Sequence, residues 1–133
     1  MSNAASDYLE NKLLDHTLRG ASGAWSAPST VYLGLYTAST GLETNTPSAE
    51  ISGNNYSRQA VTFNAAASGQ SATSATVTFP AATGSWGTIT HVAVLDASTS
   101  GNVLFWGAVT TSKTIDSGDT FQISSGNLTI TLN

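Results

Sequence analysis

The chain has 133 residues, the size of one domain, and it contains no cysteine, which excludes a disulfide framework. Only 9% of its residues are charged, against about 25% in an average soluble domain, and the net charge is −4. Its four basic residues are spread along the chain, whereas a nucleic-acid-binding surface needs clustered basic residues. No apolar run is long enough to span a bilayer or to form a signal peptide, so we expect no membrane insertion and synthesis in a cytoplasm.

Hydroxyl side chains take the place of charged ones, with 39 serine and threonine residues in the chain. Threonine is favoured on pleated sheets, and serine is favoured in turns. The composition therefore predicts an all-β protein with a neutral, hydroxyl-covered exterior.

The segment 6–20 is the one convincing helix. Asp7 is the expected N-cap, with Glu10 three residues later as in a capping box, and Gly20 is the residue expected to end the helix. Four leucines form two stripes on this helix, about 140° apart. Either one wide face packs on the sheet, or one stripe packs on the protein's own body and the other docks on a neighbouring subunit. The first stripe is Leu9 and Leu13, and the second is Leu14 and Leu18.

The next segments are a loop, 21–29, that brings Trp25 to the edge of the sheet, and a strand, 30–37. One face of the strand is aliphatic and belongs in the core. The other face is rich in tyrosine and is either a second packing surface or a ligand platform. The aliphatic face holds Val31, Leu33 and Leu35, and the other holds Tyr32, Gly34 and Tyr36.

Residues 38–55 form a long loop, which in a domain of this size is either functional or poorly ordered. Apolar and polar residues then alternate over 56–63 and 75–79, which predicts two strands. The segment 86–111 predicts a long central β-hairpin, because two apolar runs flank a polar turn at 97–102. Short strands at 121–123 and 128–132 follow.

The fold predicted from these segments is a single antiparallel β-sandwich, jelly-roll-like, with about seven to nine strands and one short N-terminal α-helix. We expect residues 1–20 to form a helical segment packed on or anchoring the domain, and residues 21–133 to form the β-sandwich domain.

Groups suited to catalysis or metal binding are scarce. The two histidines, His16 and His91, belong to no zinc-binding motif, and no serine lies in a nucleophile elbow. Asp116 and Asp119 are typical of a turn, and their segment lacks the ligand spacing of a calcium loop. We therefore predict a protein that is not an enzyme, with no metal site and no cofactor.

Aromatic side chains supply an alternative role. Planar ring faces stack on pyranose sugars, and hydroxyl-rich β-sandwiches are frequent lectin scaffolds. The alternative is a carbohydrate-binding module for host-surface recognition, with Trp25, Tyr32 and Tyr36 as the stacking residues.

Four segments carry a resemblance to a known family: the helix SDYLENKLLDHTLRG, the strands VYLGLYT and RQAVTF, and the long stretch from SWGTITH to GDTFQI. In these segments and their order, the chain resembles a family of small structural proteins of tailed bacteriophages and their prophages. Members are labelled tail fibre, minor tail or virion structural proteins.

The resemblance implies a non-catalytic virion component made in the host bacterial cytoplasm. We expect it on the particle exterior, either as a tail-fibre or minor tail protein or as a capsid decoration (cement) protein. Its implied partners are other virion proteins. The second leucine stripe predicts further copies of itself in a homo-oligomer, and the aromatic residues make a host-surface glycan an additional expected partner.

Overall fold

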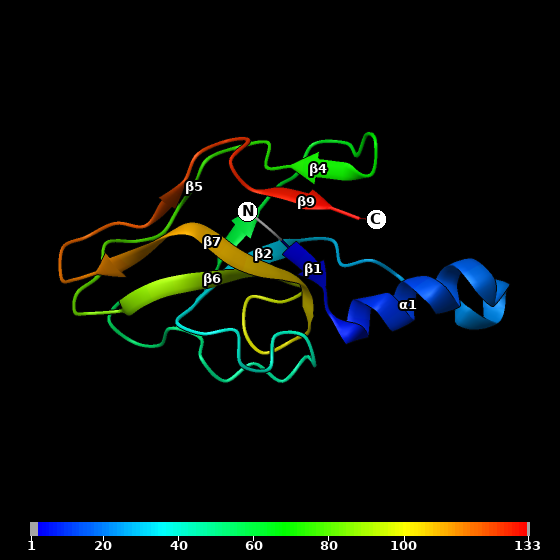
Figure 1. The fold of residues 1–133 in the computed structure, drawn as a ribbon, viewed down its shortest axis with the longest axis horizontal. Helices are drawn as coiled ribbons and strands as arrows, with labels where there is room; N and C mark the ends of the chain where they lie inside the picture. Colours follow the sequence, from blue (N-terminus) through cyan, green and yellow to red (C-terminus); the bar gives the residue numbers. More distant parts are fainter. Residues whose placement is uncertain (1–2, 133) are drawn as a thin grey trace.

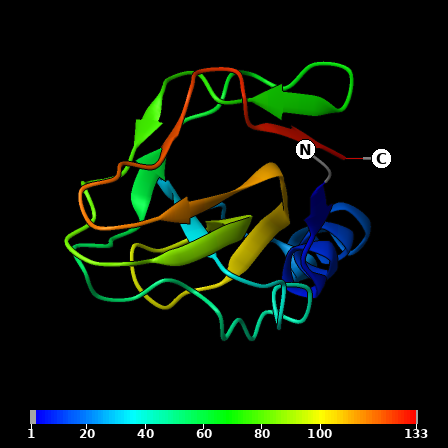
Figure 2. The same cartoon turned by 60° about the vertical axis from the view of Figure 1, so that its left-hand side comes forward.

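The computed structural model describes residues 3–132 as two layers of antiparallel strands with one α-helix beside them (Figure 1). The large layer is a five-stranded sheet in the order β1-β7-β6-β2-β3. Two strand pairs, β4 with β9 and β5 with β8, form the second layer. Figure 2 shows this layer lying across one face of the large sheet. The all-β, sandwich-like fold with a single short helix is confirmed.

The elements have the following bounds. The helices are α1 (Asp7–Leu18) and the short 3₁₀ helix η1 (Gly20–Gly23). The large sheet contains β1 (Asn3–Ala5), β2 (Val31–Tyr36), β3 (Gln59–Val61), β6 (Gly87–Leu95) and β7 (Val103–Ile115). The second layer contains β4 (Gln70–Ala72), β5 (Val77–Thr78), β8 (Gln122–Ile123) and β9 (Thr129–Thr131).

The hairpin of β6 and β7 is the centre of the large sheet, as the sequence predicts. Strand β6 pairs with β2 on one side and with β7 on the other, and its residues from Val92 to Leu95 are all buried. The main core fills the space between the two layers. Its large-sheet side includes Leu33, Leu35 and Val94, and its other side includes Phe79, Phe121 and Leu128.

A second, smaller core lies on the opposite face of the large sheet, beneath the segment 38–50. It contains Tyr36, Leu42, Ala93, Leu95 and Val103, all of which are at most 1% exposed. Burial of Leu42 fixes the segment on the sheet, and hydrogen bonds from Thr37 to Ala49 and from Ile51 to Leu35 attach its far end to β2. The long loop is therefore a folded cover over the sheet.

The structure has two strands that the sequence pattern did not predict. Strand β1 pairs with β7, with Ala5 opposite Phe105, and β4 pairs with β9, with Ser71 opposite Ile130. Both strands consist of small or polar residues without alternating hydrophobicity. Their pairing partners decide their conformation, so periodicity within the segment gives no signal.

The predicted division into 1–20 and 21–133 stays a prediction, and residues 1, 2 and 133 lie outside the described residues. The helix itself is attached to the sandwich at its first turn, where α1 contacts β1 and β7.

Candidate functional site

Helix α1 is anchored to the sandwich through Ser6, which is the N-cap in place of the predicted Asp7. The Ser6 hydroxyl accepts a hydrogen bond from the Leu9 backbone N–H at 3.3 Å and donates one to the Val103 carbonyl. The Ser6 backbone N–H also donates to the Leu104 carbonyl at 2.9 Å. Ser6 is fully buried because the same residue caps the helix and forms hydrogen bonds with β7, whereas Asp7 is exposed.

The two leucine stripes of α1 have different environments. Leu9 is 3% exposed and packs with Ala5 and Leu104, and Leu13 lies half-buried beside them. Leu14 is 56% exposed and Leu18 is 77% exposed. One stripe therefore packs on the protein's own body, and the other forms an uncovered apolar ridge, here called the Leu14–Leu18 ridge.

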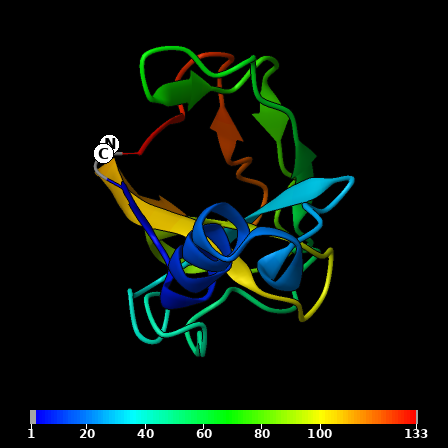
Figure 3. The ribbon, with the colours of Figure 1, turned by 90° about the vertical axis from the view of Figure 1, so that its right-hand side faces the viewer.

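The far end of α1 projects beyond the strands (Figures 1 and 3) and is closed by local contacts. Gly20 has a φ of +59° directly after the C-cap residue Arg19, as predicted for the residue that ends the helix. The chain then turns back through η1, and the Trp25 backbone N–H donates to Nδ1 of His16 at 3.1 Å. Trp25 lies half-buried against the helix and the sheet.

An apolar groove of about 340 Å³ opens between the large sheet and the strand pair β4–β9. No charged residue lines it, and Leu132 beside it is 52% exposed. Its lining includes Val31, Phe63, Leu104, Phe105, Ile130 and Leu132.

The aromatic residues expected to stack on a sugar do not form one surface. Tyr36 is fully buried beneath the 38–50 segment with Leu42 and Val103, so its ring has no exposed face for a sugar. Tyr32 lies half-buried on β2, and Trp25 lies beside α1. The expectation for Tyr36 is therefore corrected, because a chain segment distant from its strand covers the tyrosine face.

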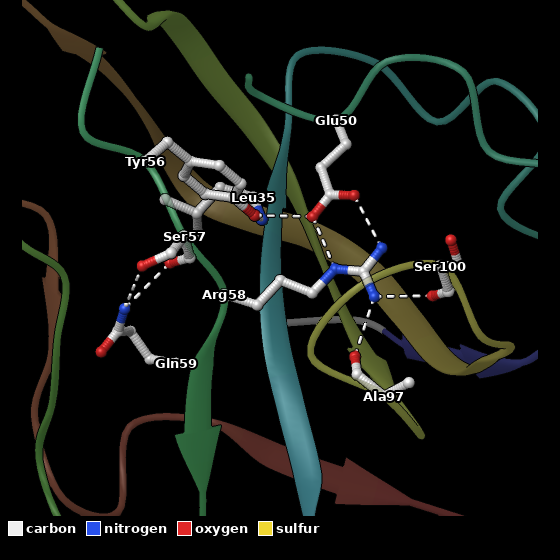
Figure 4. Close-up of polar contacts among 8 residues, drawn as sticks. All are labelled: Leu35, Glu50, Tyr56, Ser57, Arg58, Gln59, Ala97 and Ser100. Carbon is white, nitrogen blue, oxygen red and sulfur yellow. Dashed lines mark hydrogen bonds and ion pairs between the residues drawn. The ribbon is translucent and has the colours of Figure 1, made fainter. Parts of the chain in front are cut away.

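A partly buried ion pair joins three segments beside β2 (Figure 4). The Arg58 guanidinium donates to both carboxylate oxygens of Glu50 at 2.7 Å each, and its side chain is only 7% exposed. The same guanidinium donates to the backbone carbonyls of Ala97 at 2.8 Å and Ser100 at 2.7 Å. Arg58 thus holds the 49–58 segment against the loop between β6 and β7.

Tyr56 completes this cluster. Its hydroxyl donates to Oε2 of Glu50 at 2.8 Å and accepts a hydrogen bond from the Leu35 backbone N–H at 3.0 Å. Burial, and then the negative charge of Glu50, raise the pKa values of Tyr56 and Tyr36 above the ordinary value. Hydrogen bonding to Glu50 raises the pKa of Arg58, against the opposing effect of burial. Tyr56 and Arg58 therefore keep their protons at neutral pH and act in the cluster as hydrogen-bond donors that crosslink the segments.

Sequence reasoning did not single out Glu50 and Arg58. The available signal was the position of Arg58, one of only four basic residues, within a segment that otherwise alternates like a strand. Its partner Glu50 lies in the long loop predicted over residues 38–55, and only tertiary structure brings the two side chains together.

Each histidine ring forms a hydrogen bond with a nearby group of the protein. His16 accepts from the Trp25 backbone, and Nδ1 of His91 shares a hydrogen bond of 2.8 Å with the Thr90 hydroxyl. Within residues 3–132, one group of three carboxylates comes together, formed by Asp7, Glu10 and Glu43, with oxygens within 4.8 Å of one another. Asp7 and Glu10 are exposed, and proximity of exposed carboxylates alone does not make a metal site.

The described part of the chain has no helix long and apolar enough to cross a membrane. A search of curated proteins finds no match to this sequence. A family model, described as "Podophage GP4 fiber I protein gp80", matches residues 4–131, which is nearly the whole chain. The match includes the helix, the large sheet apart from the first residue of β1, and the second layer. The chain therefore belongs to the family of the podophage GP4 fiber I protein gp80.

Proposed function

We propose that this protein is a non-catalytic subunit on the exterior of a tailed-phage particle, in a fibre or minor tail structure or as a head decoration protein. Because the chain belongs to a phage fibre family, its general role is that of a structural component of the virion. The sparse chemistry of the chain supports a role without catalysis, because neither histidine has a carboxylate or serine partner among the described residues. The neutral, hydroxyl-rich composition suits a surface that must resist non-specific binding.

The observation that carries the proposal is the Leu14–Leu18 ridge. Burying a leucine side chain stabilises a protein by roughly 1.5–3 kcal/mol, so two leucines left in water on a short helix favour association. The base of this helix is fixed by the buried Ser6 and Leu9, and the ridge is therefore held in a defined position. We infer that the ridge docks on a neighbouring subunit, either another copy or another virion protein.

Quantitative mass spectrometry of purified virions tests this assignment. Hundreds of copies per particle would identify a head decoration protein, whereas a few to a few dozen would identify a fibre or tail subunit. Labelling of intact particles with an antibody against the chain checks exterior display. Absence from purified particles would contradict the proposal.

A further inference from the structure

The apolar groove lies beside the base of α1. Val31, Leu104 and Phe105 line the groove, and the same three residues belong to the small core that holds Leu9 of the helix. Strand β9, on the other side of the groove, ends on the side of the sandwich from which α1 projects (Figure 1). The groove and the Leu14–Leu18 ridge are therefore at the same end of the molecule.

The exposed large apolar side chains of residues 3–132 all belong to these two features. Leu14 and Leu18 form the ridge, and Leu132 borders the groove. A contact in which the ridge fills the groove therefore covers all three side chains at once. Removal of apolar surface from water is the main driving force of most protein association, and exposed apolar patches usually mark the surfaces that bind a partner.

The ridge has the spacing of a helix that binds in a groove. Leu14 and Leu18 are four residues apart, so they lie one turn apart on the same face. Apolar anchors at this spacing, laid into a hydrophobic groove, are a recurring mode of helix recognition. The groove suits such anchors, because its lining has no charged residue and its polar side chains, Gln70 and Ser71, are neutral. A charged segment in the same place would lose its hydration without gaining a partner.

The groove that receives the ridge belongs to another molecule. The base of α1 is fixed by the hydrogen bonds of Ser6 with β7 and by the buried Leu9. The ridge lies about 140° around the helix from the stripe that packs on the body, so it points away from its own sandwich. A second copy of the chain carries the same uncharged groove at the corresponding end. Both halves of the contact are thus encoded in one sequence.

We propose that the Leu14–Leu18 ridge of one copy inserts into the apolar groove of a second copy. This inference rests on the proposed function, in which the ridge docks on a neighbouring subunit, and it names that subunit and the surface that receives the ridge. Because ridge and groove lie at the same end, two copies that face each other can form the contact twice, once in each direction.

The test is complementation between two variants of the full chain. The ridge variant is Leu14→Asp with Leu18→Asp, which keeps an intact groove. The groove variant is Ala66→Asp with Leu132→Asp, which keeps an intact ridge and changes two exposed residues of the groove. Leu132→Asp alone is a milder version for use if the double change disturbs folding. The NMR spectrum of each variant shows whether it is folded.

Size-exclusion chromatography with light scattering, at about 100 μM protein, gives the first result. The wild type is expected to associate, and each variant alone is expected to be monomeric. An equal mixture of the two variants should form a complex of two copies, because it contains one intact ridge and one intact groove. The matched control is Ser124→Asp with Ser125→Asp, which adds the same charge in the exposed loop after β8 and should associate like the wild type.

Labelling one variant at a time locates the contact. When the ridge variant is ¹⁵N-labelled and the unlabelled groove variant is added, amide signals in 63–71 and 130–132 should shift. With the labels reversed, the shifts should lie in 11–18, on the helix. Shifts in any other part of the chain would overturn the proposal.

Three further results would also overturn it: a mixture of the two variants that stays monomeric, a folded groove variant that associates like the wild type, or a wild type that is monomeric at about 1 mM. The second result would mean that ridges pack on each other. A monomeric wild type that is nevertheless present in purified virions would reject the second copy as the partner and leave the proposed function intact. Absence from virions would reject the proposed function, whatever the association of the isolated chain.

Discussion

The Leu14–Leu18 ridge places apolar side chains in water, and the Glu50–Arg58 cluster places charged side chains in a largely covered environment. The ridge exposes two leucines to water, whereas the cluster keeps an ion pair largely away from water, with the Arg58 side chain 7% exposed and the Glu50 side chain 24% exposed. An unpaired buried charge destabilises the fold itself, whereas an exposed apolar side chain adds little to the stability of the monomer. The cluster is therefore expected to control stability and the ridge to control association.

Of the changes to the cluster and to the ridge, breaking the ion pair should lower the stability most. Arg58→Met removes four hydrogen bonds and leaves Glu50 without its partner, so we expect the free energy of unfolding to fall by about 3 kcal/mol. Urea denaturation measures the change. The matched control is Arg19→Met, because the Arg19–Asp15 pair is 3.7 Å long and 60% and 47% exposed, and its loss should change the stability by less than about 0.5 kcal/mol. Equal losses of stability in Arg58→Met and Arg19→Met would contradict the expectation that the less exposed ion pair contributes more.

High pH should weaken the same region. The raised pKa values of Tyr36 and Tyr56 mean that the folded protein keeps protons that the unfolded chain releases near its ordinary tyrosine pKa of about 10. Stability is therefore unaffected by these groups below about pH 10, and it falls above that pH by up to about 1.4 kcal/mol per pH unit for each tyrosine. Urea denaturation from pH 8 to about pH 11 measures the slope. Tyr56→Phe should be less stable than the wild type at pH 8, but its stability should fall less steeply with pH. An unchanged slope would mean that Tyr56 does not cause the loss of stability at high pH.

Loss of the N-cap should have an intermediate effect, at the point where the ridge-bearing helix joins the body. Ser6→Ala removes the cap and the bond to the Val103 carbonyl, and we expect a loss of about 1–2 kcal/mol in urea denaturation. Asp7→Ala is the matched variant one residue later and should cost less than about 0.5 kcal/mol, because Asp7 is exposed and contributes through the helix dipole. A larger loss of stability from Asp7→Ala than from Ser6→Ala would mean that Asp7 is the N-cap.

Charging the ridge should have the smallest effect on stability. Leu14→Asp with Leu18→Asp should change the free energy of unfolding of the monomer by less than about 1 kcal/mol, because both side chains are exposed. Size-exclusion chromatography with light scattering should show soluble monomers where the wild type associates. Leu9→Ala is the contrasting variant, since its buried side chain should cost about 2–5 kcal/mol. Aggregated, unfolded protein from the charged variant would mean that the ridge belongs to the core.

Local sequence determined the elements that have their own hydrophobic periodicity or a residue typical of a helix end. The apolar runs of β6 and β7 predict the central hairpin, the alternation in 30–37 predicts β2, and Gly20 marks the end of α1. The two leucine stripes also follow from the sequence alone, since helical spacing fixes which leucines share a face. In each case the information lies within a few residues of the feature that it predicts.

Tertiary structure decided which faces are covered and which polar groups meet. Tyr36 is buried because Leu42 folds back over it, and Ser6 caps the helix because β7 lies beside it. Arg58 meets Glu50 only because three separate segments converge beside β2. A strand or helix pattern specifies its own faces but not what packs on them, because the covering residues lie far away in the chain.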